Sequence, residues 1–229
     1  MHPAATVKAS KSGRPALRYI PATGLVVGGL LAAQTAMERN RHPVGIQLVD
    51  PFGSWHWQAV LALLVVMVVV AGAGFRAMAR CDEKLAESGA PRSQQLQWVA
   101  RPAAARQVVN AWVEGRLEHL VSRSIAIDTF FFAPAYSTGF ALLCFAAARA
   151  SLETSVWRSL GARAGWCAWI AGMLDVVENG TMLFQLVSRR TGVAPVTAGI
   201  SFVKWVLAFL SALFLATWAV SSVLRPLIR

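Results

Sequence analysis

Two long stretches of the chain, Gln58–Phe75 and Phe130–Ala148, contain no Asp, Glu, Lys or Arg. Each reaches the roughly 18 to 20 apolar residues that a helix needs to cross a membrane. The composition agrees, because 56% of the residues are hydrophobic and only 14% are charged, against about 45–50% and about 25% in soluble proteins. The sequence therefore predicts an all-α, polytopic transmembrane helical bundle.

Three further apolar stretches raise the predicted number of spans to about five. The two nearest the C-terminus have the length of spans but carry charged residues, so they cross a membrane only if these residues face protein. Tyr19–Met37 has no formal charge, but Pro, Gly and polar residues dilute it, and it is either a span or a surface helix. The predicted spans cover residues 19–37, 56–78, 125–148, 164–187 and 195–224.

The distribution of basic residues predicts the orientation of the spans. Cytoplasmic loops are enriched in Lys and Arg, and five spans place twice as many of these residues on the side of the amino terminus as on the opposite side. With the first span left out, the two sides carry nearly equal numbers. We therefore expect a multi-pass protein of the cell membrane with a cytoplasmic amino terminus.

Residues 1–16 are small and basic and show no hydrophobic period, so we expect a mobile tail ahead of one transmembrane domain, residues 17–229. Within this domain, apolar positions at helical spacing predict a cytoplasmic amphipathic helix over about residues 106–123. This helix lies either in the membrane interface or against the bundle. The net charge of +11 comes without a nucleic-acid-binding motif, so we expect contact with anionic lipid and no nucleic acid partner.

One predicted span contains Asp175, Glu178 and Asn179, and the next contains Lys204. An ionisable group in the middle of a bilayer costs roughly 2.5–3.5 kcal/mol on insertion scales, so such residues usually face the bundle interior and belong to a site or a pathway. At about 100° per residue, the first three residues share one helix face. The other helix carries a polar stripe on one face, formed by Thr197, Ser201, Lys204 and Ser211.

Depth predicts that the two helices bring these groups together. Glu178 and Lys204 each lie about 14–15 Å from the cytoplasmic end of their helix, at a rise of 1.5 Å per residue. Asp128 lies toward the same side, with Tyr136 at the flank of its helix face, and Pro134 predicts a kink in that helix. We expect a polar recess that opens to the cytoplasmic leaflet.

The charges of this recess do not balance. Asp128, Asp175 and Glu178 supply three carboxyl groups against the one ammonium group of Lys204, and excess buried charge is costly. A proton on a carboxyl group or a bound cation has to compensate, and oxygen ligands suit Mg²⁺ or Na⁺. We assign no metal site and require no cofactor. Alternatively, these residues only hold helices together through hydrogen bonds.

We expect an enzyme that carries out acid–base chemistry on a membrane-dissolved lipid or isoprenoid. The predicted catalytic residues are Asp128, Asp175, Glu178 and Lys204. The predicted substrate-binding residues, among which the arginines hold a headgroup or phosphate, are Asn179, Tyr136, Ser201, Arg123, Arg189 and Arg190. A proton- or cation-coupled transporter or channel subunit and a non-catalytic assembly subunit remain as alternatives. The expected partner is membrane lipid, and a homo-oligomer or a membrane protein partner is also open.

Overall fold

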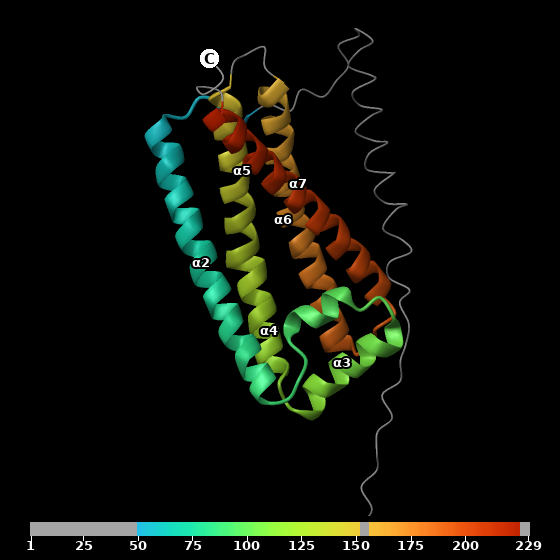
Figure 1. Ribbon diagram of the computed structural model, residues 1–229. Helices are drawn as coiled ribbons and strands as arrows, with labels where there is room; N and C mark the ends of the chain where they lie inside the picture. Colours follow the sequence, from blue (N-terminus) through green and yellow to red (C-terminus); the bar gives the residue numbers. More distant parts are fainter. Residues whose placement is uncertain (1–49, 152–155, 225–229) are drawn as a thin grey trace, which may run out of the picture. The chain divides into compact units, whose positions relative to one another are not determined.

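The computed structural model describes residues 50–151 and 156–224, and in these ranges it is all-α (Figure 1). A 3₁₀ turn, η2 (Ser93–Trp98), and a π-helical turn, η3 (Asp128–Phe132), accompany the α-helices. The predicted tail 1–16 and the predicted span 19–37 lie outside the described residues. The six described helices are α2 (Trp57–Glu87), α3 (Pro102–Glu114), α4 (Glu118–Ile127), α5 (Ala133–Arg149), α6 (Val156–Ser188) and α7 (Ala194–Leu224).

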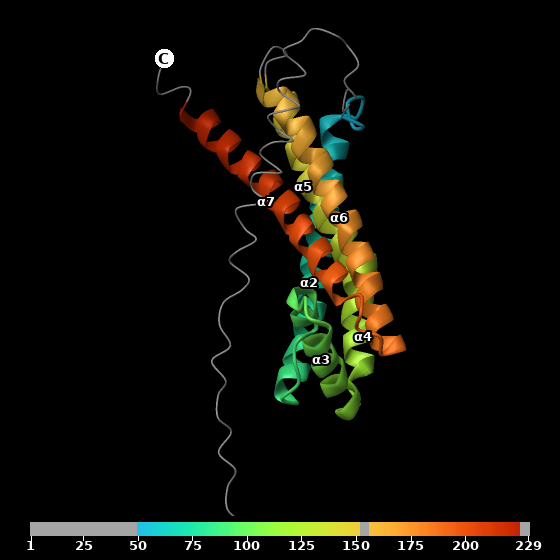
Figure 2. The ribbon, with the colours of Figure 1, turned by 90° about the vertical axis from the view of Figure 1, so that its right-hand side faces the viewer.

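Long helices of alternating direction form a bundle in the described part of the chain. α2, the joined pair α4 and α5, α6 and α7 run in turn toward and away from the end at which α3 lies (Figure 1, Figure 2). α6 packs against both α5 and α7, whereas α2 packs against α4, η3 and α5. The pair α5 and α6 therefore forms the centre of the bundle, and η2 and α3 pack against α7 near one end.

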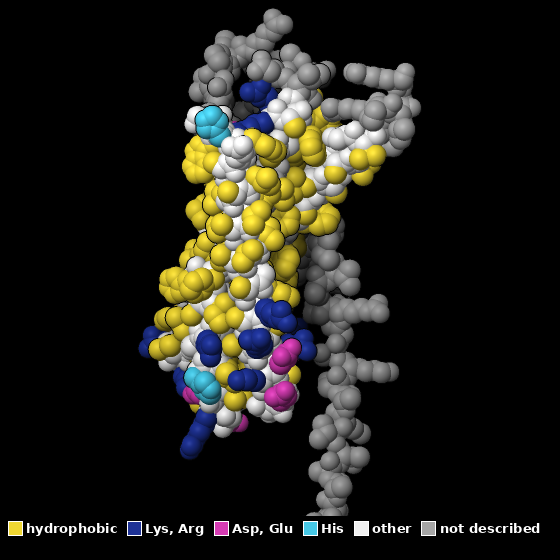
Figure 3. Space-filling view, turned by 90° about the vertical axis from the view of Figure 1, so that its left-hand side faces the viewer, with side chains coloured by type: hydrophobic (Ala, Val, Ile, Leu, Met, Phe, Trp, Pro, Cys, Tyr) yellow, Lys and Arg dark blue, Asp and Glu magenta, His cyan; other side chains and the backbone are white. Residues whose placement is uncertain are grey.

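Three helical segments are long and apolar enough to cross a membrane: Trp57–Glu87, Glu118–Arg149 and Ala194–Val223. In the first and the third, only 11% of the most apolar part is buried inside the protein, so most of their hydrophobic side chains face outward. Figure 3 shows such side chains over the middle of one face, whereas charged side chains gather at the end at which α3 lies. An apolar surface of this extent needs lipid around it, and these helices indicate a multi-pass membrane protein.

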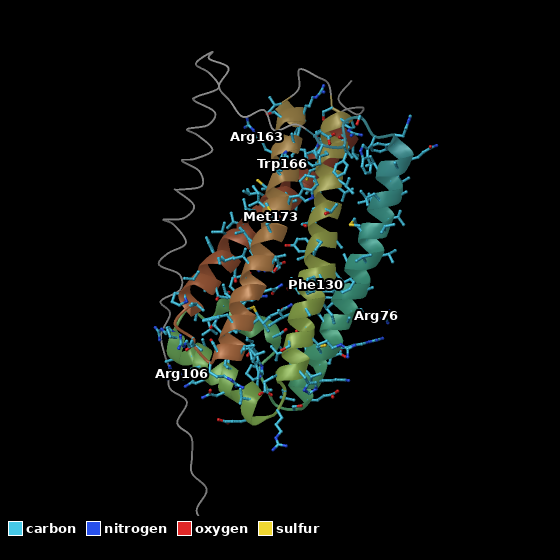
Figure 4. All side chains as sticks on the ribbon, turned by 180° about the vertical axis from the view of Figure 1, so that it is seen from behind. Arg76, Arg106, Phe130, Arg163, Trp166 and Met173 are labelled. Atoms are coloured by element: carbon cyan, nitrogen blue, oxygen red, sulfur yellow. The ribbon has the colours of Figure 1, made fainter. Side chains whose placement is uncertain are left out.

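The predicted span 164–187 lies in α6, which is not one of these three segments. With 33 residues α6 is long enough to cross a membrane. Figure 4 shows Arg163 near one end of this helix and Met173 further along it. The hydropathy of its central part is lowered by four buried polar residues, Asp175, Glu178, Asn179 and Gln185. Of the five predicted spans, the ranges 56–78, 125–148 and 195–224 coincide with the three apolar segments.

The prediction of one continuous helix over 106–123 is wrong, because α3 and α4 divide this range. Arg116 lies between them with a φ of 56°, a left-handed conformation that an α-helix does not contain. The N–H of Leu117 donates to the carbonyl of Trp112 (2.7 Å) and closes the turn. Apolar spacing continued through this turn, so periodicity alone did not reveal the break.

The apolar face of α3 is buried against the bundle. Val109 and Trp112 pack in one core with Leu85 of α2 and Met182 of α6. The indole Nε1–H of Trp112 donates to the carbonyl of Pro91 (2.6 Å) and ties α3 to the segment before η2. Because these side chains are enclosed by protein, α3 packs against the bundle, which is one of the two arrangements that its amphipathic pattern predicts.

A π-helical turn, η3, precedes Pro134, near which the sequence predicts a kink. Proline lacks an N–H, and its ring clashes with the carbonyl four residues earlier, here that of Phe130. The wider π turn ends two residues before Pro134 and lets α4 and α5 continue as one helical run. Such turns are frequent at functional sites, and this one begins at Asp128.

α5 and α6 approach each other closely where α6 has no side chain. A Cβ atom on Gly165 would lie 2.7 Å from Cζ of Phe145, and one on Gly172 would lie 2.5 Å from Cβ of Ser137. Both distances are too short for carbon atoms that are not bonded. Only glycine therefore permits this packing distance, as in other close contacts between membrane helices.

Replacement of Gly172 by alanine is expected to destabilise the protein by about 1–3 kcal/mol, because the added methyl group overlaps Ser137. Gly180→Ala, on the same helix, is the matched control, since nothing lies within 4 Å of a Cβ atom there and alanine favours helix more than glycine does. Thermal unfolding of both purified variants in the same detergent measures the difference. Equal stability of the two variants would contradict the close contact.

Candidate functional site

A buried cluster of ion pairs links α6 to α7. Nζ of Lys204 lies 2.7 Å from Oδ1 of Asp175 and 2.8 Å from Oε2 of Glu178. The exposed fractions of Lys204, Asp175 and Glu178 are only 4%, 3% and 0%. Residues three apart on a helix are neighbours on its surface, so one lysine reaches both carboxylates. The prediction that these groups meet is confirmed.

The polar stripe of α7 faces protein, as its spacing predicts. Thr197, Ser201 and Ser211 are fully buried. The hydroxyl of Ser211 donates to the carbonyl of Ala164 on α6 (2.8 Å), and Nε2 of Gln185 on α6 donates to Oγ1 of Thr197 (2.9 Å). These bonds lie on either side of the lysine along α7. They fix the rotation of α7 about its axis and keep the lysine directed toward α6.

A cavity of about 430 Å³ lies beside the ion-pair cluster, between the long helices and the turns η2 and η3. Half of the predicted site residues line it: Asp128, Tyr136, Asp175, Asn179 and Lys204. The Tyr136 hydroxyl donates to Oδ2 of Asp175 (3.0 Å). Asp175 therefore accepts a hydrogen bond on each oxygen, from Tyr136 on one and from Lys204 on the other.

The two ends of this cavity differ in polarity. Its polar end is lined by Asp82, Ser93, Gln94, Gln97 and Ser124, and its apolar end by Phe140, Ala208, Phe209 and Ala212. Phe75 on α2 and Phe209 on α7 line the cavity and are nevertheless 58% and 65% exposed. Within the described residues, the cavity therefore reaches the apolar surface of the bundle at Phe75 and Phe209.

The turn η2 covers the polar end of the cavity. Oδ1 of Asp82, in the last turns of α2, accepts hydrogen bonds from the N–H (3.1 Å) and the hydroxyl (2.7 Å) of Ser93. The same hydroxyl lies 3.2 Å from that of Ser124 on α4. At the other end of η2, Trp98 stacks on Trp205 of α7, with ring centroids 6.4 Å apart. Contacts with α2, α4 and α7 thus hold η2 in place.

Several buried polar atoms of the site have no hydrogen-bond partner. Among them are Oδ1 of Asp128, Nδ2 of Asn179 and both carboxylate oxygens of Glu178. The contact of Glu178 with Lys204 is close but lacks hydrogen-bond geometry, so it acts through charge. An unpartnered buried group costs about 1–3 kcal/mol. Because Asp128 and Asn179 line the cavity, a ligand there can supply their missing partners.

The other half of the predicted site residues lies outside the cavity lining: Glu178, Ser201, Arg123, Arg189 and Arg190. Glu178 holds the ammonium group of Lys204 from behind. The Ser201 hydroxyl donates to the carbonyl of Thr197 (2.9 Å) on its own helix. The three arginines are exposed, and Arg189 pairs with Glu118 (3.2 Å). Binding of a headgroup phosphate by these arginines stays a prediction.

Sequence reasoning missed several residues of the site. Asp82 lies in the charged last turns of α2 and is followed directly by Glu83 and Lys84, so the sequence does not distinguish it from its neighbours. Gln185 lies seven residues after Glu178, on the same helix face, so an extension of the predicted polar face would have included it. Ser93 and Gln97 belong to a polar connection without hydrophobic period. No local signal placed them at the cavity.

The carboxylates of the cavity are not gathered around one point. Asp82, Asp128 and Asp175 come from α2, η3 and α6. Within the described residues, no group of three or more His, Cys, Asp or Glu side chains is placed to hold a metal ion. The three carboxylates are therefore contributed separately by three elements of the cavity wall.

Comparisons with known proteins add no assignment to this geometry. Searches with protein-family models, among curated proteins and among solved structures found no match to the chain. The chemistry of the cavity itself is therefore the basis for a functional proposal.

Loss of the lysine is expected to destabilise the bundle strongly. Lys204→Met leaves two buried carboxylates without their cation, and breaking a buried ion pair in this way costs about 3–5 kcal/mol. Lys84→Met, at an exposed position of α2, is the control and is expected to leave stability unchanged. Unfolding of both variants in detergent, followed by circular dichroism, tests this. A Lys204→Met protein as stable as the control would show that the ion pairs contribute nothing to the fold.

Proposed function

We propose that the protein is a membrane enzyme that carries out acid–base chemistry on a lipid dissolved in the bilayer. One observation carries the proposal: a single cavity combines a buried acid–base cluster with an apolar end that is open at the side. Its volume of about 430 Å³ falls within the range of about 300–1,000 Å³ that is usual for small-molecule sites. A lipid can enter such a cavity from the membrane without an aqueous channel.

In this proposal Tyr136, Asp175 and Lys204 handle the proton. A substrate hydroxyl passes its proton to the Tyr136 oxygen while the Tyr136 proton moves to Oδ2 of Asp175, along the existing hydrogen bond of 3.0 Å. The reverse transfer returns the proton to the product. Lys204 stays bound to Oδ1 of Asp175 (2.7 Å) and stabilises negative charge that develops nearby.

Two neighbours on α6 support this group. Glu178 is a positioning residue, because it touches Lys204 and does not line the cavity. Asn179 lines the cavity with an unpartnered amide and is suited to orient a polar group of the substrate. The lateral opening and the buried charges together favour a substrate with one polar end and one apolar end.

We further propose that α6 is also a membrane span, which gives five spans with residues 19–37. α6 packs between α5 and α7 and buries its charged residues against them, as charged groups within a span require. The end of the bundle at which α3 lies then faces the cytoplasm of the cell, in agreement with the larger number of basic residues there.

Single cysteines in a variant without native cysteines test this topology. Ser54→Cys and Ser159→Cys are expected to react with a membrane-impermeant maleimide in intact cells, and Ser88→Cys and Arg190→Cys only after permeabilisation. The measurement is the mass shift of the labelled protein on a gel. Equal labelling of positions 159 and 190 from one side would rule out α6 as a span.

Lipid extracts of expressing cells test the enzymatic proposal. The parent protein is expected to change the amount of at least one lipid, measured by mass spectrometry. Asp175→Asn and Tyr136→Phe are expected to reduce this change at least tenfold, since proton transfer contributes about 10²–10⁴ to a rate. Glu178→Gln is expected to reduce it less, and Glu118→Gln, outside the cavity, to leave it intact.

Unchanged lipids with the parent protein, or the same change with every variant, would contradict the enzymatic proposal. Purified protein in liposomes then separates the alternatives. Flux that depends on Na⁺ or pH would favour a transporter that uses the same carboxylates.

A further inference from the structure

The charged side chains that line the cavity carry a negative excess. Asp82, Asp128 and Asp175 line it, whereas Lys204 is the only Lys or Arg among the lining residues in the described part of the chain. This lysine is already shared between Asp175 and Glu178. A phosphate group would therefore enter among carboxylates without a free cation, and repulsion between like charges in a site shielded from water would oppose its binding.

Asp128 is the carboxylate that remains for a ligand. Oδ1 of Asp82 accepts two hydrogen bonds from Ser93, and both oxygens of Asp175 are engaged. Oδ1 of Asp128, in contrast, is buried and has no partner. A buried carboxyl oxygen without a partner in hydrogen-bond geometry is suited to accept a hydrogen bond from a ligand.

Asn179, whose side chain lies beside Asp128, gives a second indication that a polar ligand belongs here. Its side chain is 99% buried, since only 1% is exposed, and it lines the cavity. Its amide Nδ2 nevertheless has no hydrogen-bond partner. Buried amides in closed helix packing are normally satisfied. The unmet groups of Asp128 and Asn179 therefore mark the same wall of the cavity as a place for a polar headgroup.

We propose that the cavity takes a single-chain lipid whose polar end is a protonated amine. The ammonium group pairs with Asp128 and lies near the rings of Phe132 and Tyr136, which are 5.1 Å apart between centroids and both line the cavity. Aromatic faces add to the attraction of a cation. The inference rests on the proposed function for the entry of lipid into this cavity, and it adds the chemical class of the substrate.

The apolar end of the cavity accommodates the chain of such a lipid. Ala208 and Ala212 leave space along α7, and Phe140 and Phe209 cover the sides. From there the chain reaches the apolar surface of the bundle at Phe75 and Phe209. The amine then lies on the inner side and the chain points to the membrane, so both parts of the molecule meet surfaces of their own polarity.

Binding of three matched amphiphiles tests the inference: dodecylamine, dodecanol and dodecyl phosphate. Each is titrated into the full-length protein in a neutral detergent, and native mass spectrometry counts the bound molecules. Dodecylamine is expected to bind at least tenfold more tightly than the other two, a difference of about 1.4 kcal/mol. Dodecyl phosphate is measured with and without Mg²⁺.

Two variants locate the binding site. Asp128→Asn, which keeps the shape of the side chain, is expected to reduce the affinity for dodecylamine about tenfold and to leave dodecanol binding unchanged. Glu118→Gln, an exposed carboxylate outside the cavity, is the matched control and is expected to change nothing. Ala208→Phe narrows the cavity and is expected to weaken all three ligands. Size-exclusion chromatography verifies that each variant is folded.

Equal binding of amine and alcohol, stronger binding of phosphate in either condition, or an unchanged preference in Asp128→Asn would overturn the inference. These results are independent of catalysis. A selective amine site together with unchanged cellular lipids would support the inference and contradict the enzymatic proposal. A lipid change that depends on Asp175, without selective binding of the amine, would support the enzymatic proposal and contradict the inference.

Discussion

The bundle depends on one ammonium group held between two carboxylates. Asp175 and Glu178 would be too costly to expose to lipid, and Lys204 offsets part of their charge inside the bundle. This constraint forces α6 into the middle of the bundle, where α5 and α7 cover it. The glycines of α6 then become necessary, because the close approach of α5 leaves no space for side chains. A polar helix at the centre is thus stabilised by charge on one side and by close packing on another.

The polarity of the cavity follows from where the helices carry their apolar and polar side chains. α2 and α7 expose apolar surface, whereas α6 and the polar stripe of α7 carry most of the buried polar side chains of the long helices. Between them lies a space that is acidic inside and lined by phenyl rings at its opening. A site of this kind is suited to molecules that are themselves amphipathic. The turn η2 adds polar groups at the inner end and separates them from the surroundings.

Part of this arrangement could be predicted from the sequence and part could not. Helix geometry was sufficient to bring Glu178 and Lys204 together, because both lie at the same depth in their helices, and it placed the stripe of α7 against protein. The break at Arg116 escaped prediction, since a left-handed residue leaves no mark on hydrophobic spacing. The roles of Ser93 and Asp82 depend on how a loop folds back over the bundle, which no local pattern encodes. The arginines were assigned by their position near the helix ends, and their role in binding stays a prediction; Arg189 pairs with Glu118.

The π-helical turn Asp128–Phe132 has a geometric consequence for the cavity wall. One residue on an α-helix corresponds to about 100° of rotation. Regular α-helical winding of the same residues would rotate everything before this turn by about that angle relative to everything after it. Ser124 and Asp128 would then swing away from the wall that Tyr136 and Phe140 form. The π-helical turn therefore sets the rotation of α5 relative to α4 about their common axis. Because of this rotation, residues of both helices line the same cavity.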